Sequence, residues 1–376
     1  MTQSLSAKSG SRVAVELSQH LQKLGNNVSV YAYDTDREIA NALTEKNIRV
    51  FKLSKLKSGI LSRIVPNFQL TNLLKSEKPN IAILMAFFPS ILASKLAKIP
   101  ITRIYMGTQF GAYLENKNPN EKVSLLDIVV NKISDTFIFL LELISARLSD
   151  EVVAISNYCA KEMKRLYHQK SKVIYLGGNH LPVTRNPAEG EARLWRQLPE
   201  ISYQKPLHLL SVSRITPYKN FHLLIEIMKS EKLRKKADLT IVGTSIKPKY
   251  LSYLKRHASP NVHFKTKVSD RELARLYKDS DVYVTCDRFL FFGLPIAEAA
   301  FFQKPSIALG YAAAKELIDH GKTGYIAKNL DEFAMFLEKL TIDPKLAQNL
   351  GKNAQKKAQK IFNWQRIIEQ YQMLLA

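Results

Sequence analysis

The chain has 376 residues, which is too long for one ordinary hydrophobic core, so two domains are expected. Hydrophobic residues make up 46% of it, and 14 Gly and 15 Pro exclude a composition typical of disorder. The two cysteines, Cys159 and Cys286, match no metal or redox spacing and fit a reducing compartment. No apolar run is long enough to span a bilayer and no signal peptide is visible, so a cytoplasmic location is expected.

The net charge favours an anionic partner. The 56 Lys and Arg residues exceed the 33 Asp and Glu residues and give +23, which suits nucleic acid, acidic lipid or a phosphorylated substrate, or a general solubility charge. No nucleic-acid-binding signature is present, and the cations are not interleaved with aromatic residues, so no nucleic acid is expected. The segment 52–63 mixes lysines with leucines, which fits a basic loop or a patch on anionic lipid. We favour an anionic membrane surface.

The first half of the chain begins with a loop and a helix, where an α/β domain normally begins with a strand. Residues 1–10 are polar and predict a loop, and the apolar side chains of 12–24 fall on one helical face that ends at Gly25. A long apolar segment with helical spacing occupies 124–148. Strands are also expected at 27–33, 48–53, 79–87, 101–106, 151–155 and 173–176. Helices are expected at 91–97 and 157–167, and a further helix is expected to begin at about residue 36.

A stretch rich in Pro and Gly begins at Leu181 and predicts a linker at 186–206. Beyond it, strands alternate with helices, which predicts a parallel doubly wound sheet. We therefore expect an α/β protein with two Rossmann-like domains, 1–185 and 207–362, and a cleft in which ligands meet the carboxyl ends of the strands. The second domain is expected to have strands at 207–212, 239–242, 262–264, 282–286, 306–309 and 324–326, and helices at 221–229, 250–257, 272–278, 295–302, 313–320 and 330–340.

The stretch from Asp287 to Ala300 combines a strand end, a turn and the start of a helix. Gly293 lets the backbone approach a ligand closely because it has no Cβ, and Pro295 suits the first helical turn. Glu298 follows about one turn further on, near a helix N-terminus that favours anions. The pattern is typical of a phosphate site, and also of a tight turn between core elements.

A second group of polar residues, from Ser213 to Asn220, also follows a strand. Arg214 offers a rigid fork and Lys219 a point charge, a pair that suits a diphosphate, although loop cations are more often solvated surface. The turn at Gly293 ends another strand of the same domain, which favours a shared site. Neither a Gly-rich dinucleotide fingerprint nor a Walker loop is present, and no clustered set of His, Asp and Glu predicts a metal.

Further short motifs extend this pattern over nearly the whole chain. In the second half they are Ser213-Arg214 to Lys219-Asn220, Val242-Gly243, Val262-His263-Phe264, Gly293-Leu294-Pro295, Glu298-Ala299, Lys304-Pro305, His320 to Gly324 and Phe362-Asn363-Trp364; in the first half they are Ser149-Asp150, Val153 to Ser156 and Val173 to Gly177. Together they resemble the retaining glycosyltransferases of family 4, which have the two-domain GT-B fold. The resemblance is specific in the second half and looser in the first.

The resemblance implies roles for the polar residues. Arg214 and Lys219 would bind the diphosphate of a sugar nucleotide and stabilise the leaving group, which is electrostatic work that other transferases give to a metal. Glu298 matches the second glutamate of the family's Glu–seven residues–Glu motif, which binds the ribose hydroxyls. No cofactor or metal is implied. The donor-binding residues implied are Gly243, Lys267, Val268, Asp287, Phe292, Gly293 and Leu294.

Three departures from the family pattern stand out. Leu290 occupies the place of the motif's first glutamate, so either Asp287 substitutes for it, the donor differs, or activity is lost. The stretch 105–109 lacks the family's histidine. The family's first strand and most of its glycine-rich acceptor loop are absent, with 9–12 matching only the far end of that loop, so we expect a truncated first domain whose true start lies upstream.

The resemblance thus implies transfer of a hexose, with retention, from a nucleotide-sugar (NDP-hexose) donor to a glycan, glycolipid, polysaccharide or other lipid-linked acceptor. The protein would act on the inner face of the plasma membrane. The last helix, at 363–376, would cross back to the N-terminal domain. An alternative from another class is a catalytically inactive GT-B protein that binds a nucleotide or a partner. An epimerase or a phosphorylase is less favoured, because the sequence offers no cofactor lysine site for a phosphorylase.

Overall fold

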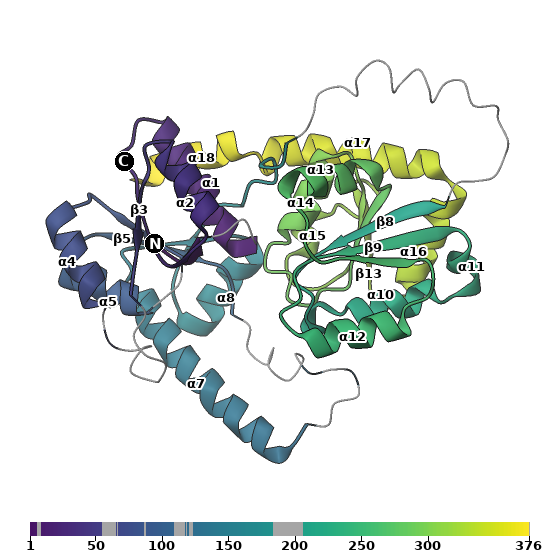
Figure 1. Cartoon of the computed structure of the whole chain (residues 1–376), viewed down its shortest axis with the longest axis horizontal. Helices are drawn as coiled ribbons and strands as arrows, with labels where there is room; N and C mark the ends of the chain where they lie inside the picture. Colours follow the sequence, from purple (N-terminus) through teal and green to yellow (C-terminus); the bar gives the residue numbers. More distant parts are fainter. Residues whose placement is uncertain are drawn as a thin grey trace. The chain divides into compact units, whose positions relative to one another are not determined.

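The computed structural model describes residues 1–5, 9–54, 65, 67–85, 88–108, 117, 119, 123–182 and 206–375 (Figure 1). The chain divides into two compact units. Unit 1 comprises Met1–Glu115, Lys122–Gly177 and Asn363–Ala376, and unit 2 comprises Asn116–Glu121 and Gly178–Phe362. Most of the expected linker, 186–205, lies outside the described residues.

Unit 1 contains two short parallel sheets. One has the order β1-β2-β3 and the other β4-β5-β6-β7. Two hydrogen bonds at Met1 join them, because its nitrogen donates to the Ile83 carbonyl at 2.6 Å and its carbonyl accepts from the Met85 N–H at 3.0 Å. The joined order, β3-β2-β1-β4-β5-β6-β7, is that of a doubly wound sheet. The strands are β1 (Thr2–Leu5), β2 (Ser29–Thr35), β3 (Arg49–Lys52), β4 (Ala82–Leu84), β5 (Ile101–Tyr105), β6 (Glu151–Ala154) and β7 (Lys172–Val173).

The strand β1 corrects two predictions from the sequence. We expected a loop at 1–10 and no first strand, but β1 pairs in parallel with β2, with Leu5 opposite Thr35. The signal was weak because the strand has only four residues, of which Leu5 alone is apolar. Leu5 is fully buried. The strand is also stabilised by backbone hydrogen bonds to β2, which the pattern of side chains in the sequence does not indicate. The first strand is therefore present.

The helices of unit 1 include one from the far end of the chain. The last helix, α18, packs on α1, where the His20 ring stacks on Trp364 with 5.6 Å between ring centroids. Gly177 lies directly against the same indole, since a Cβ there would stand 2.4 Å from Cδ1 of Trp364. The helices are α1 (Ser9–Lys23), α2 (Arg37–Thr44), α4 (Phe68–Glu77), α5 (Phe88–Leu96), α7 (Leu125–Leu148), α8 (Asn157–Tyr167) and α18 (Trp364–Leu375).

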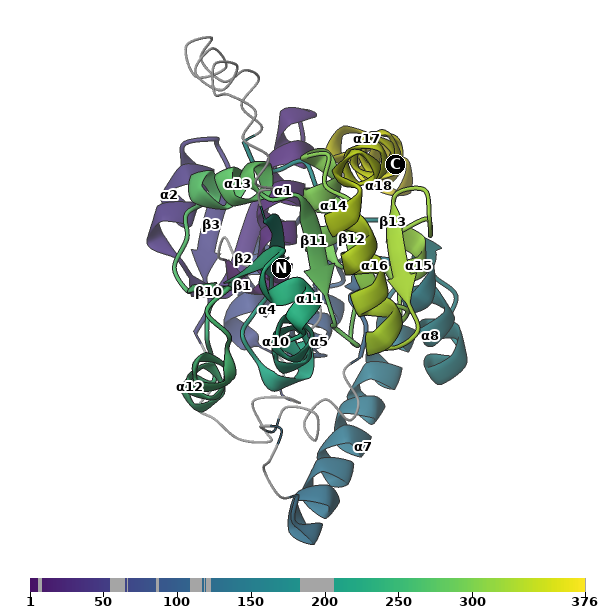
Figure 2. The ribbon, with the colours of Figure 1, turned by 90° about the vertical axis from the view of Figure 1, so that its right-hand side faces the viewer.

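Unit 2 is a second doubly wound unit, built on one parallel sheet with the order β10-β9-β8-β11-β12-β13. Figure 2 shows α16 lying along β12 and β13, and α14 packs on α17. The strands are β8 (Leu207–Val212), β9 (Ala237–Val242), β10 (Val262–Lys265), β11 (Val282–Thr285), β12 (Ser306–Leu309) and β13 (Gly324–Ala327). The helices are α10 (Phe221–Met228), α11 (Glu231–Arg234), α12 (Pro248–His257), α13 (Asp270–Asp279), α14 (Leu294–Phe301), α15 (Ala314–Leu317), α16 (Leu330–Ile342) and α17 (Pro344–Ile361), with a short 3-10 helix, η1, at Pro217–Lys219.

The strand order of unit 2 indicates where a sheet of this kind takes up a ligand. From β8 the chain moves to β9 and β10 on one side, and β11 then starts on the other side and leads to β12 and β13. The direction of winding thus reverses between β8 and β11, and open α/β sheets bind ligands at the carboxyl ends of the strands at such a point. The α/β fold with two parallel-sheet units agrees with the prediction.

Candidate active site

Two loops meet at the point where the winding of unit 2 reverses. Strands β8 and β11 are neighbours, with Leu209 opposite Val282. The loop after β8 carries Arg214 and Lys219, and the loop after β11 carries Asp287. Both loops therefore lie at the same edge of the sheet.

An ion pair joins the two loops. The Lys219 ammonium donates to Oδ2 of Asp287, and both side chains are mostly buried. The other carboxylate oxygen, Oδ1, accepts the N–H of Phe289 at 2.9 Å. Asn220 adds a second link, because its Nδ2 donates to the Cys286 carbonyl at 3.1 Å. The structure thus brings together two residues that the sequence assigned to one site, and it pairs them directly.

Arg214 reaches the same place through Tyr218, which the sequence did not single out. The exposed guanidinium of Arg214 donates through Nη2 to the Tyr218 hydroxyl at 2.8 Å. The Lys219 ammonium lies 5.2 Å from the centroid of the same ring. The buried ring also packs edge-on against Phe289. Tyr218 therefore holds both cations next to each other, which suits binding of two phosphate groups.

Glu298 sits in α14 and is held by two residues that the sequence missed. Its Oε2 accepts the Tyr277 hydroxyl at 2.6 Å, and its Oε1 lies 3.2 Å from Nε2 of His180. All three side chains are buried. Burial, with the nearby Glu298 charge, raises the pKa of Tyr277 well above its usual value, so the phenol remains a donor. A carboxylate held in this way keeps lone pairs for further hydroxyl donors.

Two glycines shape the backbone of the site. Gly293 is the N-cap of α14 and has φ of +84°, a left-handed conformation that favours glycine. A Cβ at Gly243, just after β9, would stand 1.6 Å from the carbonyl oxygen of Ser213, so no side chain fits there. The Ile215 N–H donates to the Thr244 carbonyl at 3.0 Å and keeps the two loops close.

The apolar neighbours of Gly293 face inward. Leu290 is buried, and a Cβ at Gly293 would lie 3.0 Å from its side chain. Phe292 is also buried, and its ring packs edge-on against Phe362. Leu294 begins α14 and is half-buried. Leu290 and Phe292 can therefore contribute only backbone groups to a ligand.

Lys267 and Val268 lie further from the ion pair. They follow β10, which is separated from β8 by β9, and this places them about 10 Å away along the sheet edge. Lys267 is exposed and Val268 is half-buried. The structure leaves them at the sheet edge, and among the described residues no side-chain hydrogen bond or ion pair joins them to the residues around Lys219.

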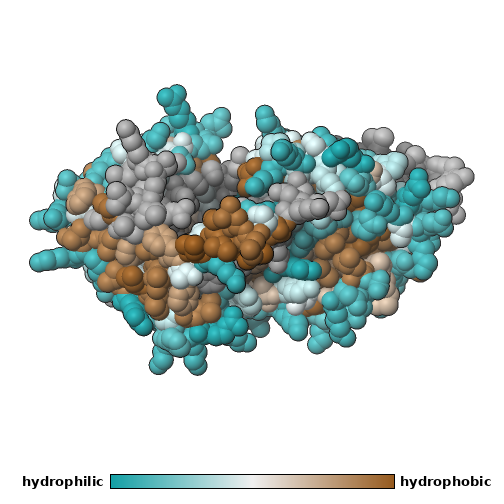
Figure 3. Space-filling view, turned by 90° about the horizontal axis from the view of Figure 1, so that it is seen from below, coloured by the Kyte–Doolittle hydropathy of each residue, from teal (hydrophilic) through white to brown (hydrophobic). Residues whose placement is uncertain are grey.

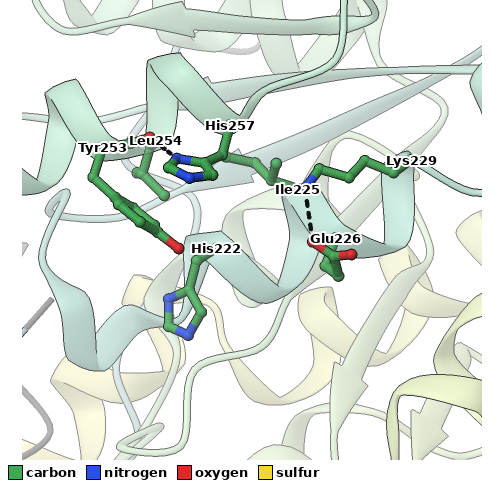
Figure 4. A pocket seen from close by; sticks show the side chains of 7 residues that line it. All are labelled: His222, Ile225, Glu226, Lys229, Tyr253, Leu254 and His257. Carbon is green, nitrogen blue, oxygen red and sulfur yellow. Dashed lines mark hydrogen bonds and ion pairs between the residues drawn. The ribbon is translucent and has the colours of Figure 1, made fainter. Parts of the chain in front are cut away.

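A small cavity lies elsewhere in unit 2, between α10 and α12 (Figure 4). Its volume is about 50 Å³, which holds at most a few water molecules. Burial, with a contribution from the Arg288 charge, lowers the pKa of His222 in its wall. The cavity is therefore too small for a nucleotide sugar. Its lining residues are His222, Ile225, Glu226, Lys229, Tyr253, Leu254 and His257.

Unit 1 has a buried polar cluster where the family's histidine is missing. The Tyr105 hydroxyl donates to Oε2 of Glu162 at 2.5 Å, and the Thr108 N–H donates to the same oxygen at 3.1 Å. The Thr108 hydroxyl also lies 2.9 Å from that of Tyr167. Burial raises the pKa of Glu162 above its usual value. These contacts fix the end of β5 to α8.

The part of the chain that the structure describes lacks both a metal-binding group and a membrane-spanning helix. There, no group of three or more His, Cys, Asp or Glu side chains is placed to hold a metal ion. Within the same residues, no helix is both long enough and apolar enough to span a membrane. The basic segment 52–63 lies outside the described residues from 55 onwards.

Solved structures show the class of fold. A structure from Anabaena, Alr3699/HepE in complex with UDP and glucose, superposes with a TM-score of 0.73 over 100% of this chain and 97% of that one, at 18% identity. A glycosyltransferase from Rickettsia africae superposes with a TM-score of 0.71 over 99% and 96% of the two chains, at 17% identity. The two units therefore form the GT-B fold, as predicted.

Sequence comparisons give the family. Residues 10–179 match the family described as Glycosyltransferase Family 4, and residues 198–357 match Glycosyl transferases group 1. Spore coat protein SA of Bacillus subtilis is 24% identical over 242 residues, 58% of this chain and 63% of that protein. The chain thus spans under two thirds of that relative's length. Between them the two matches extend over both units, and the chain belongs to the GT-B glycosyltransferases of the family 4 type.

Proposed function

We propose that the protein transfers a hexose from a nucleotide-sugar donor to a glycan or lipid-linked acceptor, with retention of anomeric configuration. The observation that carries the proposal is the meeting of Arg214, Lys219 and Asp287 where the winding of unit 2 reverses. That point is where an open α/β sheet takes up a nucleotide. UDP and glucose are bound by the Anabaena structure of the same fold, which supports a donor of this kind.

The two cations take the diphosphate in this proposal. The Arg214 fork binds oxygens of both phosphates, and the Lys219 ammonium adds a point charge. As the bond between sugar and phosphate breaks, negative charge grows on the leaving diphosphate, and both cations stabilise it. Because these side chains already do the work of a divalent cation, we expect no metal requirement.

Asp287 takes over from the missing first glutamate of the family motif. Leu290, which occupies that place, is buried and carries no polar group. Asp287 follows the same strand, and its carboxylate has lone pairs beyond those used by Lys219 and Phe289. It accepts a hydroxyl of the donor sugar. Glu298 accepts the ribose hydroxyls, and backbone groups at Gly243 and Gly293 face the donor.

The acceptor and the setting follow from the same proposal. The excess of cations, +23 in all, favours an acceptor or a surface that carries negative charge. A lipid-linked or cell-envelope glycan at the inner face of the plasma membrane meets this condition. The protein would then be cytoplasmic and bound to that surface peripherally.

The test uses calorimetry with a panel of nucleoside diphosphates and sugar nucleotides, followed by an assay for donor hydrolysis and transfer. We expect Lys219→Ala and Glu298→Ala to abolish turnover while the thermal unfolding transition persists. Arg271→Ala serves as a matched control, because this cation lies on the exposed surface of α13. Unchanged turnover in Lys219→Ala or Glu298→Ala would refute the assignment.

A second candidate is an inactive GT-B protein that binds a nucleotide or a partner. The buried Leu290 in place of a carboxylate is the observation that favours it. It predicts nucleotide binding in the calorimeter without hydrolysis or transfer for any donor. Measurable turnover that depends on Asp287 would exclude it.

A further inference from the structure

The long helix α7 of unit 1 exposes an apolar face. Leu126 is 71% exposed and Ile133 is 66% exposed, and Val130, Leu140 and Ile144 are also exposed. These residues are spaced by four, three, seven and four positions, so they lie along one side of the helix. Figure 3 looks onto the molecule from the side on which α7 lies in Figure 1, and apolar side chains gather there. Exposed apolar faces of this extent mark interaction sites.

The inner side of α7 is mixed, because buried polar residues lie beside apolar ones such as Phe139, whose ring stacks on Tyr167 of α8. The buried residues of α7 are Asn131, Ser145 and Ala146. Glu142 pairs with the buried Arg103 of β5, which holds the helix in this orientation. The apolar side chains on the outer side of α7 are exposed to water, which is unfavourable, and covering them with an apolar phase removes this cost.

The acidic and basic side chains of α7 differ in their surroundings. All three acidic side chains have partners within unit 1: Asp127 caps the N–H of Ser124, Asp135 accepts from Asn131, and Glu142 pairs with Arg103. The cations Lys132 and Arg147 are exposed and, among the described residues, form no ion pair. The outer side of α7 therefore offers apolar groups and positive charge.

We propose that the outer side of α7 lies in the headgroup region of an anionic lipid bilayer. The 24 residues of α7 would be long enough to cross a bilayer, but no helix of the described residues is apolar enough to do so, which leaves α7 an orientation along the surface, as in an amphipathic anchor. The net charge of +23 attracts the chain to anionic lipid and repels a second copy of it. The inference rests on the proposed function for its membrane setting, and it gives that setting a docking element.

The test is flotation of the full chain with vesicles of phosphatidylcholine alone or mixed with phosphatidylglycerol. The variants are Ile133→Asp on α7 and Ile342→Asp at the end of α16, a matched residue that is 70% exposed in unit 2. We expect the wild type and Ile342→Asp to bind the mixed vesicles at least about tenfold more tightly than phosphatidylcholine, and Ile133→Asp to lose this binding. Lys132→Gln with Arg147→Gln should lower the binding and its dependence on salt.

Three results would overturn the proposal. The first is Ile133→Asp binding as well as the wild type. The second is equal loss in both Asp variants, which indicates a general charge effect. The third is a wild-type dimer in sedimentation that Ile133→Asp dissociates while vesicle binding is absent, which assigns the face to a second copy. Unfolding curves verify that each variant folds, and calorimetry with nucleoside diphosphates, done without vesicles, tests the donor site separately.

Discussion

Replacing Asp287 by Asn is expected to tighten the binding of a nucleoside diphosphate. In the free protein the Asp287 carboxylate pairs with Lys219, so it competes with the phosphates for that cation. Asn keeps an oxygen for the Phe289 N–H, which Asp287 Oδ1 accepts at 2.9 Å, and it removes the negative charge. Lys219 then has its full charge available for the ligand.

The size of the effect follows from the geometry of the pair. Two unit charges about 3 Å apart attract by roughly 5 kcal/mol at an effective dielectric constant of about 20. Both side chains are mostly but not fully buried, so water reduces this value, and coupling energies of contacting pairs are about 0.5–3 kcal/mol. If removing the Asp287 charge makes about 1–2 kcal/mol of this attraction available for binding the ligand, the affinity for the ligand rises roughly 5- to 30-fold.

Calorimetry measures this change directly. Wild type and Asp287→Asn are titrated with a nucleoside diphosphate and with the matching monophosphate, which lacks the second phosphate. We expect the gain for the diphosphate only, together with slower hexose transfer, because Asp287 no longer binds the donor sugar. An unchanged or weaker diphosphate affinity, or an equal gain for the monophosphate, would show that Asp287 does not restrain Lys219.

Three further predictions concern buried contacts. Tyr277→Phe removes a hydrogen bond to the buried Glu298 carboxylate, worth about 1.5–3 kcal/mol, and should weaken nucleotide binding about tenfold in calorimetry but spare analogues without ribose hydroxyls. Burial raises the pKa of Glu162 above its usual 4.5, so its contribution to stability is full below that pH and is lost as pH rises through the raised pKa. Glu162→Gln should therefore lessen the fall in Tm with rising pH, as thermal unfolding at several pH values would show. Gly243→Ala places a Cβ 1.6 Å from the Ser213 carbonyl oxygen and should lower the Tm by more than about 5 °C, since loops must move to accommodate it.

The alternation of strands and helices in unit 2 was predictable because most of its strands, other than the edge strand β10, are largely buried on both faces. Such strands appear in the sequence as short apolar runs, as in β8 and β11, and the polar residues that follow them mark the carboxyl edge. Arg214 and Lys219 were singled out in this way, whereas Asp287 was named through the resemblance to the family motif. In unit 1 the same reasoning missed β1, whose pattern has a single apolar residue and whose stability comes from backbone pairing.

The contacts within the site were not predictable, because they join residues far apart in the chain. Lys219 and Asp287 are 68 positions apart, and the pair forms only because β8 and β11 are neighbours. Tyr277 belonged to an expected helix, and nothing in its spacing showed that its hydroxyl reaches Glu298. His180 follows two glycines and precedes the linker, where no pattern indicates the direction of a side chain.

The assembly of unit 1 from both ends of the chain has a consequence for synthesis. Its helix α18 lies beyond the whole of unit 2 in sequence, yet Trp364 packs against Gly177 and His20. A ribosome therefore releases all of unit 2 before the last piece of unit 1, whereas domains made of one continuous segment fold as they emerge. Until α18 is synthesised, the surface of α1 that it covers is exposed. Synthesis of unit 1 therefore begins first, but unit 1 can complete its fold only after unit 2 has been made.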